Sequence, residues 1–228
     1  MFEPDGRPGQ QRTMPFAAIA GLALTADGRR LAAVGGEVSP DSDAQPRIFD
    51  LPELSGESAM PKVGDEAKLR WSGDGRWLVS AAEKKTPYVF AVLACEPGKA
   101  RPSWRGTGNA VAVRGNQIVT WTQTQTTRAE IALWNPEQKQ PVRSASLKTP
   151  IGGKDCSVAV IQGGSHLVVR TQAISIIDLA TLELVASFDY SFSGTSPRLD
   201  ASPDGRYLLL NFAVQDRLWV VDSQSLLP

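Results

Sequence analysis

The stretch that most constrains the fold is a short phrase near the end of the chain, Ala-Ser-Pro-Asp-Gly-Arg-Tyr-Leu-Leu-Leu at residues 201–210. Pro203 fixes φ for the first corner of a turn, and the Asp204 side chain can bond back to the backbone. Gly205 suits the position that needs a positive φ. The phrase therefore predicts a strand end, a tight turn and a buried strand.

The same phrase occurs twice earlier in the chain. Residues 25–33 read Thr-Ala-Asp-Gly-Arg-Arg-Leu-Ala-Ala, and residues 72–80 read Ser-Gly-Asp-Gly-Arg-Trp-Leu-Val-Ser. Two further glycine turns, at Gly115 and Gly164, also stand before apolar runs. The chain is therefore built from a repeated unit. The repeat indicates the architecture of the protein but not its function.

The period of the repeat identifies the architecture. Five turn glycines mark equivalent points, at Gly28, Gly75, Gly115, Gly164 and Gly205, and their successive separations are 47, 40, 49 and 41 residues. In four repeats the third apolar run ends in an acid or amide, at Asp50, Asn135, Asp178 and Asp222. About 44 residues with four short strands is the period of a β-propeller blade. A β-sandwich is the alternative fold, but a sandwich would not explain why the same turn sequence recurs at the same place in each repeat.

The repeats predict an all-β chain, a β-propeller of about five four-stranded blades whose last blade is incomplete or closed by the N-terminal segment. The blades are expected at about 16–62, 63–105, 106–150, 151–192 and 193–228. Residues 1–15 form an N-terminal segment in which Gln10–Phe16 could supply the closing strand. The other reading is that these residues are part of a larger propeller protein.

Composition excludes some function classes. Among 228 residues, 24 are Lys or Arg and 24 are Asp or Glu, so we expect no nucleic-acid partner, since phosphate binding usually needs a basic excess. Cys95 and Cys156 have no metal-binding spacing and are expected to be free buried thiols of a cytoplasmic protein. We expect no membrane partner, because no apolar run is long enough to span a bilayer. Residues 14–26 resemble a signal-peptide core, which would instead make the protein secreted or periplasmic.

The repeats resemble the WD40-repeat propellers and their bacterial relatives. The resemblance rests on the Ser-Pro-Asp-Gly-Arg turn followed by a dipeptide in the place of Trp-Asp: Phe49-Asp50, Trp134-Asn135, Ile177-Asp178 and Val221-Asp222. It implies a rigid platform for protein partners. The family's Gly-His dipeptide is missing and the chain has one histidine, so the buried Asp–His–Ser/Thr–Trp network of well-formed WD40 blades is expected not to exist here. The second repeat also departs from the pattern, near Ala91-Val92.

Residues suited to catalysis are scarce. His166 is the only histidine, and its slot after the turn is filled elsewhere by Arg30, Trp77 and Tyr207, which indicates a tolerant strand position. The loop acids Asp41 and Asp43 lack the spacing of a calcium loop. The chain has no nucleophile elbow, phosphate loop or dinucleotide fingerprint. We therefore expect no catalytic residues, metal site or cofactor.

The tryptophans are the candidate residues for contact with a protein partner. Trp71, Trp134 and Trp219 fall on alternating apolar positions and are expected to pack between blades. The less clearly internal Trp77, Trp104 and Trp121 are candidate partner-binding residues, since an exposed tryptophan on a propeller rim would be a hot spot. Filling gaps between blades is the alternative for these three.

The sequence favours a non-enzymatic protein–protein interaction scaffold built on a WD40-like propeller. The alternatives are a small-molecule-binding or hydrolytic propeller with its site at the central channel, and a fragment of a larger propeller protein. Neither the partner nor the binding face follows from the sequence.

Overall fold

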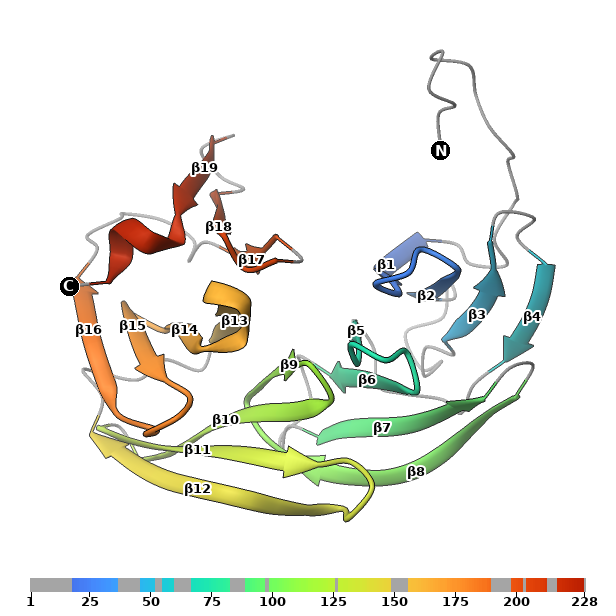
Figure 1. Cartoon of the computed structure of the whole chain (residues 1–228), viewed down its shortest axis with the longest axis horizontal. Helices are drawn as coiled ribbons and strands as arrows, with labels where there is room; N and C mark the ends of the chain where they lie inside the picture. The colour runs from blue at the N-terminus through green and yellow to red at the C-terminus, as the bar shows by residue number, and fades with distance from the viewer. Residues whose placement is uncertain are drawn as a thin grey trace. The chain divides into compact units, whose positions relative to one another are not determined.

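The computed structural model describes residues 18–36, 46–51, 55–59, 67–82, 89–96, 99–125, 127–148, 156–189, 198–202, 204–212 and 217–227. The chain divides into two compact units, Met1–Gly106 (unit 1) and Thr107–Pro228 (unit 2). Five antiparallel sheets follow one another along the chain, and in each the strands pair in sequence order (Figure 1). Successive meanders of this kind are the blades of a β-propeller, which confirms the expected fold class.

Unit 1 holds two sheets of four strands. The first sheet consists of β1 (Ala18–Leu24), β2 (Arg30–Gly36), β3 (Arg47–Asp50) and β4 (Ser55–Ala59). The second sheet consists of β5 (Ala67–Trp71), β6 (Trp77–Ala82), β7 (Val89–Glu96) and β8 (Lys99–Thr107).

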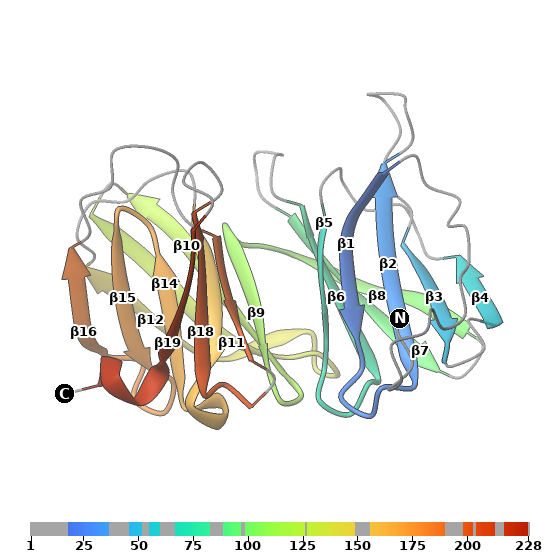
Figure 2. The ribbon, with the colours of Figure 1, turned by 90° about the horizontal axis from the view of Figure 1, so that it is seen from above.

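The two sheets of unit 1 pack through their first strands, β1 and β5, which lie side by side (Figure 2). Alternating apolar residues turn toward a shared cluster, whose buried members are Ala32, Val34, Ile48, Leu69, Trp71, Leu78, Leu93 and Cys95. The indole Nε1 of Trp71 donates to the Ala23 carbonyl oxygen at 3.0 Å. The predicted packing of Trp71 between blades is therefore confirmed.

Unit 2 holds three sheets. The third consists of β9 (Ala110–Arg114), β10 (Gln117–Gln125), β11 (Arg128–Asn135) and β12 (Gln140–Lys148). The fourth consists of β13 (Ser157–Ile161), β14 (His166–Arg170), β15 (Ala173–Asp178) and β16 (Leu184–Asp189). The fifth has three strands, β17 (Arg198–Ala201), β18 (Tyr207–Phe212) and β19 (Arg217–Asp222). The predicted incompleteness of the last sheet is thus present among the described residues.

Two apolar clusters hold unit 2 together. The larger one joins the third and fourth sheets around Trp121, Ile131 and Leu167. The smaller, here called the third cluster, joins the fourth and fifth sheets. Its buried members are Ala159, Ile161, Val168, Ile176, Leu199, Leu208 and Leu210. Burial of such alternating side chains on facing sheets is the main stabilising contribution in this fold.

Several sequence expectations fall outside the described residues. These are the N-terminal segment with the strand candidate Gln10–Phe16, the loop acids Asp41 and Asp43, and the beginning of the signal-like stretch at residues 14–17. Residues 18–24 of that stretch form β1. Both cysteines are free as expected, but only Cys95 is buried, while Cys156 is partly exposed. Burial raises the pKa of the Cys95 thiol to about 12.

Candidate interaction surface

Side-chain hydrogen bonds within the repeated turn sequence hold the turn in place. In the last repeat the Ser202 hydroxyl donates to Asp204 Oδ1 at 2.6 Å and accepts from the Tyr207 N–H at 2.9 Å. The same Asp204 oxygen accepts from the Arg206 N–H at 3.0 Å. The hydrogen bond from Ser202 is the main cause that lowers the pKa of Asp204. Gly205 takes the positive φ, at 71°, that the turn needs.

Equivalent bonds form in the first two sheets. Thr25 donates to Asp27 Oδ1 and Ser72 to Asp74 Oδ1, each at 2.6 Å. The pKa of Asp27 is lowered, chiefly by the hydrogen bond from Thr25. A hydroxyl two residues before the aspartate is therefore the feature that the three phrases share, and it explains why they are so similar in sequence.

In unit 2 the acid or amide that ends each third strand accepts hydrogen bonds from the next turn. Asp178 Oδ1 accepts from the N–H groups of Ala180 and Thr181 at 2.6 and 2.9 Å, and these bonds are the main cause that lowers its pKa. Asn135 does the same for Glu137 at 2.8 Å. This is an Asx turn, so the residue in the place of the family's Trp-Asp aspartate has a structural role.

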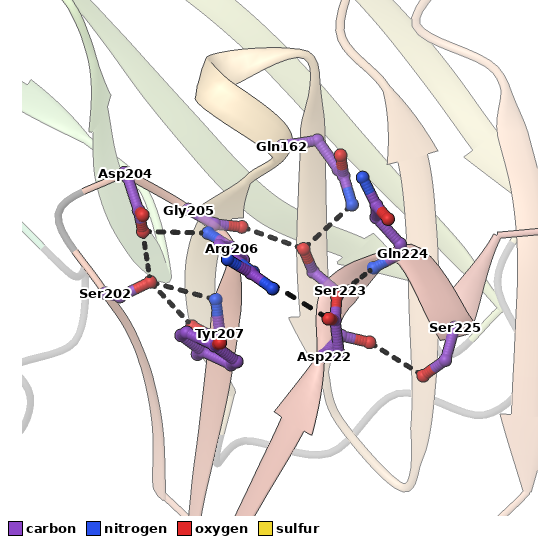
Figure 3. A network of polar contacts seen from close by, with 10 residues as sticks. All are labelled: Gln162, Ser202, Asp204, Gly205, Arg206, Tyr207, Asp222, Ser223, Gln224 and Ser225. Carbon is purple, nitrogen blue, oxygen red and sulfur yellow. Dashed lines mark hydrogen bonds and ion pairs between the residues drawn. The ribbon is translucent and has the colours of Figure 1, made fainter.

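In unit 2 the turns of neighbouring sheets contact each other through a polar network (Figure 3). The Gly205 carbonyl oxygen accepts from the Gln162 N–H at 2.8 Å and from the Ser223 hydroxyl at 2.9 Å. The Gln162 side chain in turn donates to the Ser223 oxygen at 2.8 Å. The network joins the fourth and fifth sheets through hydrogen bonds between its own residues, so its role is structural.

His166 stands beside Ser165 and Asp178. Its Nδ1 lies 2.7 Å from Ser165 Oγ, and its Nε2 lies 4.0 Å from Asp178 Oδ2. The Ser165 hydroxyl oxygen also lies 2.9 Å from the Gln162 carbonyl oxygen. The direction of the bond between Ser165 and Nδ1 depends on the tautomer of His166. That His166 is a structural strand residue stays a prediction.

The three candidate tryptophans differ in exposure. Trp121 is 2% exposed within the larger cluster of unit 2, so its expected availability on the surface is wrong: the third and fourth sheets cover it on the face where alternation places it. Trp77 is partly buried. Trp104 is also partly buried and packs edge-on against Phe90 with ring centroids 5.2 Å apart. Whether Trp77 or Trp104 contacts a partner stays a prediction.

Of the tryptophans expected to pack between blades, Trp134 is partly buried and donates from Nε1 to Thr120 Oγ1 at 2.9 Å. Trp219 departs from the expected packing, because 43% of it is exposed. It lies on β19, and the described part of the chain provides no fourth strand beside it. Alternation placed Trp219 on an inward face correctly, but that face is only partly covered.

The strand β19 carries an exposed apolar group, hereafter the β19 patch: Leu218 at 60%, Trp219 at 43% and Val220 at 59% exposure. The third strands of the other sheets are mostly buried at their centres, as Phe49 in β3 and Ile176 in β15 are, with no exposed area. Sequence reasoning missed this patch because all third strands look alike in sequence.

The described ranges contain no group of three or more His, Cys, Asp or Glu residues suited to a metal ion. None of the described helical turns is long and apolar enough to span a membrane. The exposed apolar residues of β19 are one feature of the described surface, beside Leu22 and Leu24 of β1 and Leu184 and Phe188 of β16.

No protein-family model matches the chain, and no curated protein matches it in sequence. Several solved structures share its fold. The periplasmic gluconolactonase PpgL of Pseudomonas aeruginosa aligns with a TM-score of 0.68 and 17% identity, over 99% of this chain and 75% of that protein. The β-propeller domain of Cps50 (Swd1) from Myceliophteria thermophila aligns at 0.65 and 20%, over 92% and 67%. The WD40 domain of Toxoplasma gondii coronin aligns at 0.61 and 13%, over 91% and 56%.

These likenesses show that the chain has the β-propeller fold, the fold of WD40 domains. At such identities they show nothing about activity, and they include both an enzyme and WD40 domains.

Proposed function

We propose that this chain is a non-enzymatic scaffold that binds a protein partner, and that the β19 patch is its contact surface. The observation that carries the proposal is the exposure of Leu218 and Val220 on one face of β19 and of Trp219 on its other face. Large exposed apolar side chains that lie together mark interaction sites more often than ordinary surface. Tryptophan is also among the residues that contribute most at interfaces.

The polar geometry supports a scaffold over an enzyme. The one histidine contacts Ser165, and Asp178 Oδ1 accepts hydrogen bonds from the backbone of its own turn. The gluconolactonase likeness keeps a small-molecule or hydrolytic propeller as the alternative. That alternative predicts a rise in melting temperature with some member of a metabolite and metal panel, and a panel without any shift would remove it.

Partner retention tests the proposal. The full chain is immobilised and exposed to extract from its source organism, beside a Leu218→Lys/Val220→Lys double variant. Val142→Lys is the matched control, since Val142 is 42% exposed on β12, away from the patch. We expect a defined set of proteins to be retained by the native chain and by the control but lost from the double variant. Equal retention by all three would refute the proposed surface.

A further inference from the structure

His166 lies in a series of polar contacts that runs through the turns of unit 2. It pairs directly with Asp178 across β14 and β15, and its Nε2 lies 4.0 Å from Asp178 Oδ2, within the range of an ion pair. On its other side, Nδ1 lies 2.7 Å from Ser165 Oγ. Ser165 Oγ in turn lies 2.9 Å from the Gln162 carbonyl oxygen. The imidazole is therefore a titratable link between an acid and the turn that precedes β14.

The series of contacts reaches the sheets on both sides. Toward the third sheet, the turn after β15 contacts β12, where the Arg143 guanidinium donates to the Ala180 carbonyl oxygen. Toward the fifth sheet, the Gln162 N–H donates to the Gly205 carbonyl oxygen at 2.8 Å. His166 thus stands in the middle of a junction that joins all three sheets of unit 2.

One charge state of the imidazole satisfies all three of these side-chain contacts. A carbonyl oxygen and a carboxylate can only accept hydrogen bonds, so the Ser165 hydroxyl must donate to Gln162, and Nε2 must donate toward Asp178. With its one hydrogen given to Gln162, Ser165 can only accept from Nδ1. A neutral imidazole carries one N–H and an imidazolium carries two. The complete set of contacts therefore needs the protonated form.

The charges around the imidazole come from two of the elements packed against it. On β15, hydrogen bonds from the N–H groups of Thr181 and Ala180 lower the pKa of Asp178, so this carboxylate is ionised at neutral pH. On β9 of the third sheet, the charge of Arg114 also acts on Asp178 and opposes a second cation nearby. The strand β13, which pairs with β14 on its other side, has no charged residue.

At the adjoining turn of the fifth sheet, the charged groups contact one another. Asp204 Oδ1 accepts from the Arg206 N–H at 3.0 Å, and Arg206 Nε lies 3.8 Å from Asp222 Oδ2. In the described part of the chain, the carboxylate within ion-pair distance of His166 is that of Asp178. An imidazolium therefore meets an opposite charge at its closest charged contact.

We propose that His166 makes the junction of the three sheets in unit 2 sensitive to pH, with uptake of a proton tightening it. The histidine is the only one in the chain, and imidazole is the side chain that ordinarily changes charge between pH 5 and 8. The complete set of contacts stabilises the junction at the acidic end of this range, and the contribution is lost as pH rises and His166 loses its proton. The β19 patch takes no part, so failure of this inference would leave the proposed function standing.

Amide hydrogen exchange on the full chain tests the junction. Protection factors, which correct for the pH dependence of exchange itself, are measured by NMR at pH 5.5 and 7.5 for the amides of Gln162 and Leu179, which donate across the turns of the junction. We expect at least threefold greater protection at pH 5.5. The Ser72 amide is the internal control, because it lies in the same turn sequence of the second sheet, where Trp77 takes the place of His166. Its protection is expected to stay constant.

Substitutions separate the contacts. His166→Gln cannot take up a proton and is expected to remove the pH response. Asp178→Asn removes the charge but keeps an oxygen for the turn, as Asn135 does at the same place in the third sheet, and should reduce the response at least twofold. Asp222→Asn is the matched control, because Asp222 pairs with Tyr207 where Asp178 pairs with His166. Its pH response should equal that of the native chain.

Three results would overturn the proposal. An equal pH response in the native chain and in His166→Gln would mean that the proton binds elsewhere. Greater protection at pH 7.5 would mean that repulsion from Arg114 outweighs the pair with Asp178. A response that persists in full in Asp178→Asn would mean that this carboxylate does not hold the imidazolium, and that result remains available should His166→Gln fail to fold.

Discussion

Gly205 is the position where a single methyl group should do the most damage in unit 2. Its φ of 71° is left-handed, and an added Cβ would lie 2.8 Å from the Gln162 nitrogen and 2.9 Å from the Ile161 Cα and carbonyl carbon. These are backbone atoms of the neighbouring sheet, so they cannot turn aside as a flexible side chain would. Gly205→Ala must therefore separate the two turns.

The matched control is Gly115→Ala. Gly115 also has a positive φ, 53°, but nothing lies within 4 Å of its added Cβ, and it belongs to the same unit. Both variants bear the cost of a left-handed alanine, about 1 kcal/mol. Gly205→Ala also weakens the Gln162 N–H to Gly205 and Gly163 N–H to Asp204 bonds, of 2.8 and 3.2 Å, at about 1 kcal/mol each.

We therefore expect the free energy of unfolding to fall by about 1 kcal/mol in Gly115→Ala and by about 3 kcal/mol in Gly205→Ala. Urea denaturation followed by circular dichroism measures both, with the midpoint as the readout if the slope is unchanged. Equal losses in the two variants would refute the reasoning, because they would mean that the turn-to-turn contact contributes nothing beyond backbone strain.

Three further predictions follow from single groups. Since the folded pKa of Asp204 lies below its ordinary value of 3.8, its charge stabilises the fold above that value and this contribution is lost as pH falls through the lower folded pKa. Asp204→Asn should therefore show less acid destabilisation below pH 3.8 in thermal melts. Cys95, whose pKa is about 12, should resist iodoacetamide at pH 8 in the folded chain while the partly exposed Cys156 reacts, as mass spectrometry would show. Trp71→Phe should lose the bond to the Ala23 carbonyl oxygen and about 1 kcal/mol of stability, which a urea titration would measure.

The sequence was sufficient for the repeat and its turns because these depend on local chemistry. Ser202 and Asp204 form a hydrogen bond within the turn, and Gly205 adopts the positive φ that the turn requires. The acid at the end of the third strand is equally local, as Asp178 shows. Such features recur wherever the same short sequence recurs, so a period could be measured from them.

The exposure of the tryptophans could not be predicted in the same way. Alternation tells which face of a strand a side chain takes, but not what covers that face. Trp121 is buried because two sheets meet over it, and Trp219 is exposed because its sheet has three described strands. Coverage depends on strands distant in sequence, so the β19 patch became visible only in the folded chain.

The most direct test of the account is photo-crosslinking from the patch in the cells of the source organism. A benzophenone side chain is placed at position 220 in the full chain, and at the exposed position 142 as the control. The account predicts a crosslink from position 220 to a discrete second protein, which position 142 does not form and which Leu218→Lys abolishes. Crosslinks from position 220 that stay within the chain, or that match those from position 142, would contradict it.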